Sequence, residues 1–327
     1  MLNINAMKHR KIFVAGNTGM VGSAICRQLS TDPNVELITR GRDELDLLDQ
    51  NAVQNFMRTT KPDEVILAAA MVGGIQSQIS FPADFIYKNV LIQNNVIHAS
   101  HLINVNKLLF ISSSCIYPVC APQPIHEDSV LTGILDPTHE PYALAKIVGM
   151  KMCDSYNRQY GRHYRCVVPS NLYGPGDNYR IENNHVVPAL IRRFHEAKLH
   201  NSSEVVVWGT GAPMREFMYV DDMAEASLFV HNLPDTIYEE NMGSMLSHIN
   251  IGTGVDVTIK ELAQTVKAVV GFKGELIFDK SKPDGTMRKL MDVSTLRALG
   301  YVASTSLRSG LELAYADFFQ NSSALRM

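Results

Sequence analysis

Tyr142 and Lys146 lie four residues apart at the start of a long helical pattern that follows Pro141. Four residues make about one helical turn, so both side chains lie on one face of the helix. A neighbouring ammonium stabilises a phenolate and would bring the tyrosine pKa from about 10 toward ~7. The pair could then exchange a proton with a carbonyl or alcohol oxygen. A tyrosine and a lysine with this spacing also occur by chance on solvent-exposed helices. Whether the pair is functional therefore depends on the elements that surround it.

A short buried strand and a glycine-rich turn come near the start of the chain. The apolar run 12–15 is typical of a strand covered on both faces of a parallel sheet, and residues 23–29 predict a helix. Between them, a G-x-x-G-x-x-G loop allows close backbone approach to a pyrophosphate at the helix N-terminus. The pattern predicts dinucleotide binding by Gly16, Asn17, Thr18, Gly19, Met20, Val21 and Gly22.

The second predicted strand, 35–39, ends where the adenosine ribose would lie. Dinucleotide folds place an acidic residue there for NAD, whereas an arginine accommodates the 2′-phosphate of NADP. Arg40 and Arg42 favour NADP(H), although Asp43 and Glu44 follow and could simply pair with them.

A third strand is predicted over 64–70, a helix over 81–102, and a fourth strand from residue 107. This fourth strand changes abruptly from apolar residues to serines and Cys115. Ligands of open parallel sheets bind outside the carboxyl ends of the strands, so chemistry is expected here. In extended chain, Ser113 and Cys115 would point to the same side. A buried structural thiol is the alternative.

The alternation of strands and helices continues through the helix that ends at Gly161 and a strand over 164–168. It predicts an α/β fold with a doubly wound parallel sheet of the Rossmann type. We expect residues 1–171 to form the nucleotide-binding domain. Residues 172–327 would be mainly a smaller α/β substrate-binding domain, with some segments returning to the first.

The second half is less regular. His185 precedes a predicted helix, and residues 205–209 predict a strand that contains Trp208, the only tryptophan. Arg215 precedes a further helix, for which an aspartate at 221–222 is the expected N-cap.

Composition excludes several partners. The formal net charge is −3, from 30 basic and 33 acidic residues, so no strong field attracts nucleic acid or an anionic membrane. The five cysteines are scattered without C-x-x-C, which argues against a disulfide framework or a zinc site and favours a reducing cytoplasm. No apolar run approaches the ~18 residues of a membrane span. A small specific ligand is the expected partner, with no metal.

Five segments together resemble the extended short-chain dehydrogenase/reductases and, within them, the GDP-L-fucose synthase family. The similarity covers nearly the whole chain. The segments are the glycine loop with residues 20–25, Ser113-Ser114-Cys115-Ile116-Tyr117-Pro118, Asn171-Leu172-Tyr173-Gly174-Pro175, Pro213-Met214-Arg215-Glu216-Phe217, and residues 282–289.

The resemblance implies epimerisation of GDP-4-keto-6-deoxy-D-mannose at C3 and C5 and NADPH-dependent reduction at C4. Cys115 and His185 would be the acid–base pair at carbon, because a thiol and an imidazole titrate near neutrality. Ser113 and Tyr142 would hydrogen-bond the C4 oxygen. Tyr142 would then protonate that oxygen, while Lys146 binds the nicotinamide ribose and lowers the tyrosine pKa.

Further contacts are implied by the same resemblance. One departure is Thr18, where the family commonly has an arginine that grips the 2′-phosphate, so the preference for NADP could be weaker. Substrate contacts would come from Arg193, Trp208, Arg215, Asp284 and Lys289. Cofactor contacts, besides the glycine loop, would come from Arg42, Asp46, Leu47, Ile111, Ser112, Ser113, Lys146, Pro169, Ser170, Asn171, Leu172 and His185.

Other functions remain open on the sequence alone. A 4,6-dehydratase needs carboxylates where Ser114 and Cys115 stand. A GDP-L-colitose synthase performs the same chemistry on a 3-deoxy sugar, and a redox-sensing scaffold would keep the fold without turnover. The resemblance also implies a homodimer built on the helix from residue 81 and the one from Tyr142.

Overall fold

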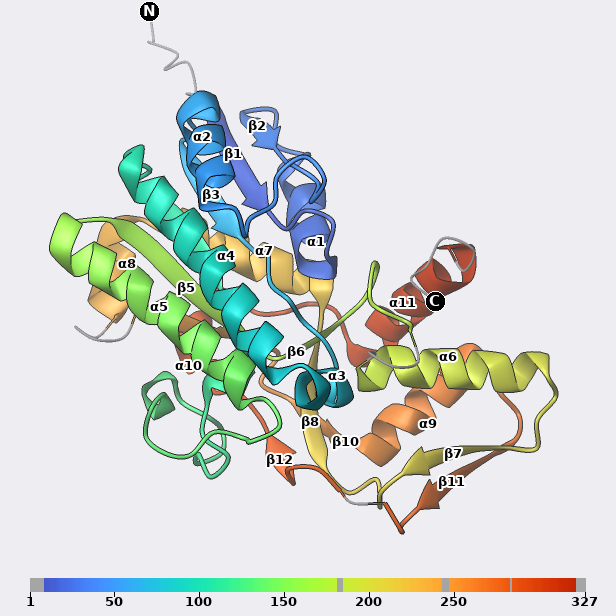
Figure 1. Cartoon of the computed structure of the whole chain (residues 1–327). Helices are drawn as coiled ribbons and strands as arrows, with labels where there is room; N and C mark the ends of the chain where they lie inside the picture. Colours follow the sequence, from blue (N-terminus) through green and yellow to red (C-terminus); the bar gives the residue numbers. More distant parts are fainter. Residues whose placement is uncertain (1–8, 181–184, 243–246, 283, 322–327) are drawn as a thin grey trace, which may run out of the picture.

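The computed structural model describes residues 9–180, 185–242, 247–282 and 284–321, and it is organised around one parallel sheet (Figure 1). This sheet has six strands in the order β2-β1-β3-β4-β5-β9. Every pair of neighbours in it is parallel. The strands are β1 (Arg10–Ala15), β2 (Val35–Ile38), β3 (Glu64–Leu67), β4 (Lys107–Ile111), β5 (His163–Pro169) and β9 (His248–Ile251).

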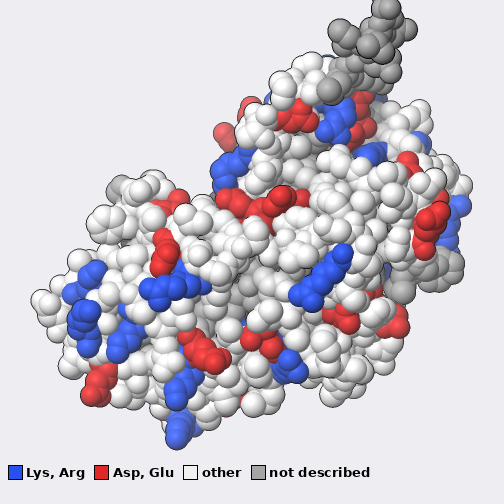
Figure 2. All heavy atoms as spheres, turned by 180° about the vertical axis from the view of Figure 1, so that it is seen from behind, with Lys and Arg blue, Asp and Glu red and all other residues white. Residues whose placement is uncertain are grey.

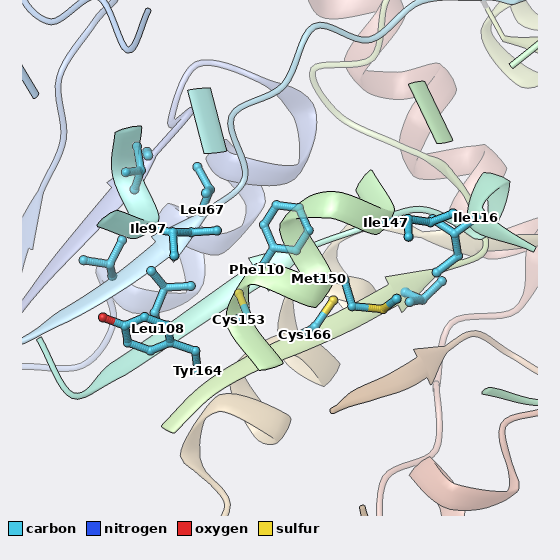
Figure 3. Close-up of a cluster of buried hydrophobic side chains, with 14 of the residues drawn as sticks. Leu67, Ile97, Leu108, Phe110, Ile116, Ile147, Met150, Cys153, Tyr164 and Cys166 are labelled. Atoms are coloured by element: carbon cyan, nitrogen blue, oxygen red, sulfur yellow. The ribbon is translucent and has the colours of Figure 1, made fainter. Parts of the chain in front are cut away.

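Helices cover both faces of the sheet, which confirms the predicted doubly wound fold. On one face, α2 (Gln50–Thr60), α4 (Pro82–Leu102) and α5 (Glu140–Tyr160) enclose one apolar core. On the other, α1 (Met20–Leu29) and α7 (Val220–Asn232) enclose a second. Figure 3 shows the first core, where Phe110 of β4 packs among Met150 and Cys153 of α5.

The two longest helices, α4 and α5, run side by side (Figure 1). Gly149 lets them approach, because a Cβ at this position would lie 2.7 Å from Gln93 Oε1 and 2.5 Å from the Phe110 ring. The helix α5 begins with Pro141 in its first turn, and it ends at Gly161, whose φ of 62° is the left-handed conformation that glycine adopts without strain. Both ends agree with the sequence.

Most of the second half forms a smaller α/β unit with a third apolar core. Its sheets are β10-β8-β12, with β6 paired to β8, and β11-β7. Its main helices are α6 (Val186–Leu199), α9 (Ile259–Val270) and α11 (Leu307–Asn321), and its strands are β6 (Asn171–Tyr173), β7 (Glu204–Trp208), β8 (Met214–Tyr219), β10 (Asp256–Thr258), β11 (Glu275–Asp279) and β12 (Arg288–Lys289). Elsewhere in the chain, the shorter helices are α3 (Ile75–Ser80), α8 (Asp235–Asn241) and α10 (Ser294–Ala298), and the 3-10 turns are η1 (Ser114–Ile116) and η2 (Glu127–Ser129). Other second-half elements belong with the first sheet instead: β9 is its last strand, and α7, α8 and α10 contribute to the core on one of its faces.

Several element ends differ from the sequence prediction. The first helix begins at Met20 instead of residue 23, because the glycine loop closes at once. The strand β3 ends at Leu67, before the small residues 68–70. The aspartate cap on α7 is wrong: Tyr219 is its N-cap, and Asp221 and Asp222 lie in its first turn, where carboxylates still favour the helix dipole.

Charges of both signs are interspersed on the face shown in Figure 2, where no broad patch of one sign stands out. This distribution fits the small net charge of −3. Within the described parts of the chain, no helix is long and apolar enough to cross a membrane.

Candidate active site

A cavity of about 1260 Å³ lies where β1, β3, β4 and β5 end, and the smaller unit forms its other wall. The strand order reverses between β1 and β3, since the chain runs outward from β1 to β2 and then returns to β3. A parallel sheet leaves a crevice at such a switch point, and this is where dinucleotides bind. The predicted loop, serines, tyrosine and lysine all meet in this cavity.

The glycine loop is tight enough to exclude side chains at two positions. Gly16 has a φ of +94°, and a Cβ there would lie 2.6 Å from the Ala69 nitrogen. A Cβ on Gly22 would lie 2.0 Å from the Gly16 carbonyl oxygen. This packing brings the N-terminus of α1, with Gly19 as its cap, to the cavity wall. First-turn amides lack partners within their own helix, so they can receive a diphosphate.

Beyond the loop, the cavity reaches the end of β2, where Arg40 and Arg42 line it together with Asp46 and Leu47. The guanidinium of Arg40 lies 5.4 Å from the centre of the Phe56 ring and donates a hydrogen bond to the Thr39 carbonyl. These contacts hold Arg40 against the protein.

Four buried polar atoms of residues on the cavity wall have no hydrogen-bond partner among the described residues. They are Asn17 Oδ1, Gln78 Oε1, Ser112 Oγ and Ser170 Oγ. Buried polar atoms in folded proteins are almost always hydrogen-bonded, so these four indicate a polar ligand or ordered water. Together with the glycine loop and the two arginines, they fit a phosphorylated dinucleotide.

Tyr142 and Lys146 are both buried on the face of α5 that closes this cavity. Lys146 Nζ donates a hydrogen bond of 2.8 Å to the carbonyl of Ile111, at the end of β4. It also lies 5.8 Å from the centre of the Tyr142 ring. Burial lowers the pKa of Lys146 to about 8, against opposing effects of Cys166 and Cys115.

The expected lowering of the Tyr142 pKa by Lys146 is wrong for this structure. Burial raises the pKa of Tyr142 well above its usual value, the neighbouring Cys115 raises it further, and a hydrogen bond from Ser113 opposes both. Burial in a water-poor environment disfavours the charged phenolate of Tyr142. The Lys146 ammonium does not offset this effect, because it is directed to the backbone carbonyl of Ile111. Tyr142 is therefore a protonated phenol at neutral pH, which is the form that donates a proton.

Ser113 and Cys115 do come together, although not through extended chain. Ser113 is extended, but residues 114–116 turn at once into η1. The Ser113 hydroxyl caps this turn: it accepts from the Cys115 backbone N–H at 3.4 Å and donates to Cys115 Sγ, also at 3.4 Å. The thiol is thereby held beside Ser113 and near Tyr142.

His185 stands on the cavity wall that the smaller unit provides, as the N-cap of α6. Its side chain is exposed toward the cavity. The protein atoms around the imidazole nevertheless displace part of its water, and this desolvation lowers its pKa. Cys115 and His185 thus come from different units and line one cavity.

The predicted substrate contacts lie at the far end of the cavity. Arg193, Trp208, Arg215 and Lys289 line it. Asp284 does not: its carboxylate accepts hydrogen bonds from the Thr210 backbone and hydroxyl at 2.9 and 2.6 Å. It lines an adjoining cavity of about 330 Å³, whose wall also includes Arg193, Trp208 and Arg215.

Sequence reasoning missed some cavity residues. Asp136 and His139 precede the tyrosine helix and line the cavity, as do Gln78 and Lys88 from α3 and α4. His139 lies only three residues before Tyr142, at the N-cap of the same helix, and this proximity was an available signal. Lys88 lies in the helix that the sequence predicts over 81–102, but nothing in that pattern marks it as a cavity residue. Asp136 and Gln78 come from segments without a recognisable pattern.

The fold and the arrangement of this site define a class of Rossmann proteins with a dinucleotide-binding cavity that holds a Tyr–Lys pair. A model of the NAD dependent epimerase/dehydratase family matches residues 12–252. The chain belongs to this family.

Within the family, sequence identity to individual relatives shows which members this chain resembles more. The chain is 57% identical to GDP-L-fucose synthase of Escherichia coli (strain K12) over 320 residues, covering 98% of this chain and all of the relative. It is 37% identical to GDP-L-colitose synthase of Yersinia pseudotuberculosis over 302 residues, covering 92% and 95%. The resemblance to GDP-L-fucose synthases is confirmed.

A solved structure agrees in fold over nearly the whole length. The GDP-L-fucose synthetase of Naegleria fowleri bound to NADP superposes with a TM-score of 0.88 at 26% identity, covering 98% of this chain and 97% of that one.

Proposed function

We propose that this protein converts GDP-4-keto-6-deoxy-D-mannose to GDP-L-fucose by C3 and C5 epimerisation and NADPH-dependent reduction at C4. The observation that carries the proposal is one cavity containing a buried Tyr–Lys pair, a Ser113–Cys115 contact and His185 on the facing unit. The 57% identity to a GDP-L-fucose synthase over the full relative supports the substrate class.

The reducing half uses residues of the first sheet. The glycine loop would hold the diphosphate, Arg42 the 2′-phosphate, and Lys146 the nicotinamide ribose. NADPH, when bound, supplies the hydride for C4. Tyr142 gives its phenolic proton to the C4 oxygen, and the hydrogen bond from Ser113 stabilises the phenolate that this leaves.

The epimerising half depends on the acidity of C3 and C5 beside the C4 ketone. Cys115 and His185 exchange protons with these carbons from opposite sides of the ring. Ser113 and Tyr142 hydrogen-bond the C4 oxygen and stabilise the enolate. Arg193, Trp208, Arg215, Lys289 and, from the adjoining cavity, Asp284 would contact the GDP moiety and the sugar. Arginines suit the diphosphate because guanidinium binds its oxygens bidentately.

The domain division follows the two walls of the cavity. We infer that residues 1–171 bind mainly the dinucleotide and that residues 172–327 bind mainly the GDP-sugar. Within this division, the second-half elements β9, α7, α8 and α10 belong structurally with the first sheet.

We infer a cytoplasmic protein without nucleic-acid or membrane partners. All five cysteines are free. Two of them, Cys153 and Cys166, are fully buried in the first core, in keeping with thiols kept in a reducing compartment.

Incubation with GDP-4-keto-6-deoxy-D-mannose and NADPH, followed by NMR of the product, tests the function. We expect GDP-L-fucose. A product with unchanged configuration at C3 and C5 would exclude the proposed epimerase activity. Turnover of the 3-deoxy keto sugar alone would make the protein a GDP-L-colitose synthase instead.

Replacement of Arg42 by alanine tests the 2′-phosphate contact. A charge-assisted hydrogen bond contributes roughly 1.5–3 kcal/mol, so the Michaelis constant for NADPH should rise on the order of ten- to a hundredfold. The constant for NADH should hardly change. Arg58→Ala, on the exposed surface of α2, is the matched control. Equal effects of Arg42→Ala on both cofactors would exclude the contact.

A homodimer through α4 and α5 is expected from the apolar residues that these adjacent helices expose. Ile86 and Tyr87 are exposed on α4, and Leu144 and Val148 on α5. Light scattering should give twice the mass of the chain. Val148→Glu would bury an unpaired charge, at a cost of roughly 3–5 kcal/mol, and should raise the dimer dissociation constant at least a hundredfold. Leu313→Glu, an exposed position on α11, should leave the mass unchanged. A monomeric wild type would refute the dimer.

A further inference from the structure

Gln93 is a buried polar residue of α4 whose side chain points into the contact with α5. It is 2% exposed, and its Nε2 donates a hydrogen bond of 2.6 Å to the backbone carbonyl of Ala145. Because a carbonyl can only accept, the nitrogen of the amide must face it, and this fixes the orientation of the amide. Gln93 is not one of the described residues that line the cavity, so any effect on the reaction passes through a neighbour.

The carbonyl that Gln93 binds lies in the turn of α5 that carries the Tyr–Lys pair. Ala145 immediately precedes Lys146 and follows Tyr142 by three residues. Inside an α-helix, a carbonyl already accepts from the backbone N–H four residues later, but its oxygen has a second lone pair. The helix does not need the hydrogen bond from Gln93. This hydrogen bond instead ties α5 to α4 at the turn between the two side chains.

Gly149 leaves the space that the Gln93 amide occupies. A Cβ at this position would lie 2.7 Å from Oε1 and 2.8 Å from Cδ of Gln93, and 2.5 Å from the Phe110 ring. The amide and the ring therefore both lie against the bare backbone of α5. Because protein interiors are close-packed, contacts of this kind allow the helix little freedom to shift over the sheet.

Phe110 extends these contacts to Lys146. Its ring centre lies 4.8 Å from Lys146 Nζ, and the next residue of β4, Ile111, accepts the hydrogen bond of the ammonium at 2.8 Å. Two neighbouring residues of β4 thus hold the ammonium, whereas α5 carries the backbone of the lysine. The position of α5 over β4 decides where the remaining N–H groups of Lys146 point, and Gln93 contacts α5 at this place.

We propose that Gln93 is a positioning residue for the reduction at C4. It holds α5 where Tyr142 reaches the C4 oxygen and Lys146 reaches the nicotinamide ribose. The proposal rests on the proposed function. Cys115 lies in η1 and His185 is the N-cap of α6, so the groups that exchange protons with carbon are not carried by α5. Reduction should therefore depend on Gln93 more than epimerisation does.

Gln93→Met tests the proposal, because methionine is similarly long and flexible but cannot donate to the Ala145 carbonyl. A misplacement of about 1 Å can cost ~10²-fold in rate, so single-turnover NADPH oxidation should slow on the order of ten- to a hundredfold. The Michaelis constant for GDP-4-keto-6-deoxy-D-mannose should hardly change, since no substrate contact is removed. Deuterium exchange at C3 and C5 without NADPH should keep most of its rate, because Ser113 still stabilises the enolate.

The double variant Gln93→Met/Tyr142→Phe shows whether Gln93 acts through the tyrosine. Residues that act as a unit give losses that overlap, so the loss in the double variant should fall well below the product of the two single losses. An independent structural contribution would instead multiply. Ser100→Ala is the matched control, because Ser100 is also buried on α4 but donates to the Val96 carbonyl of its own helix at 2.7 Å. Its rate of hydride transfer should equal that of wild type.

Three results would overturn the inference alone: wild-type hydride transfer in Gln93→Met, equal losses of hydride transfer and exchange, or losses that multiply in the double variant. Gly149→Ala crowds the same contact and should give the same pattern, so it replaces Gln93→Met if that variant does not fold. Absence of both NADPH oxidation and exchange in the wild type would overturn the proposed function as well.

Discussion

Tyr142→Phe is expected to lower the rate of hydride transfer from NADPH by a factor on the order of 10²–10⁴, the contribution of a positioned general acid. The substitution keeps the buried ring and its edge contact with Phe85, 6.3 Å away, but removes the proton. Because burial raises the pKa of this phenol, the wild-type side chain carries its proton throughout the neutral range. The loss should therefore be similar at pH 6 and pH 8.

Single-turnover measurement of NADPH oxidation gives this rate separately from substrate binding. Tyr160→Phe is the matched control, since Tyr160 lies on the same helix but on the exposed surface, where its hydroxyl contacts Gln159. Substrate affinity should change little in either variant. Wild-type turnover in Tyr142→Phe would exclude this tyrosine as the acid.

Cys115→Ala is expected to abolish or greatly slow deuterium exchange at C3 and C5 in the absence of NADPH. Enolisation needs a base at carbon but no hydride, so it isolates the epimerase half. The variant removes the sulfur to which Ser113 donates but keeps Ser113, Tyr142 and Lys146. With NADPH it should therefore still reduce the ketone slowly, giving a 6-deoxy sugar with unchanged C3 and C5.

The matched control is Cys120→Ala, because Cys120 is exposed, free and outside the cavity lining. Its exchange rate should equal that of wild type. His185→Gln should slow exchange as well, by removing the proton partner on the other wall. If Cys115→Ala exchanges both positions at the wild-type rate, Cys115 is only a packed thiol, and another base must be sought.

The sequence by itself determined the first sheet and the residues gathered at its edge. Continuous apolar strands, a glycine loop and a Tyr-x-x-x-Lys helix are local patterns, and parallel strands necessarily bring their carboxyl ends to one edge. The position of the cofactor loop, Ser113, Tyr142 and Lys146 in one cavity follows from these patterns alone. Cavity lining by His185, Arg193 and Arg215 agrees with the expectation that the family resemblance gave.

Tertiary structure decided what depends on neighbours distant in sequence. The hydroxyl of Ser113 contacts Cys115 because the chain leaves the sheet in a 3-10 turn, which this hydroxyl caps. The raised pKa of Tyr142 comes from burial that no local pattern reveals. Likewise, the sequence could not show that β9 adds to the first sheet beside β5, since that pairing is fixed by packing across about eighty intervening residues.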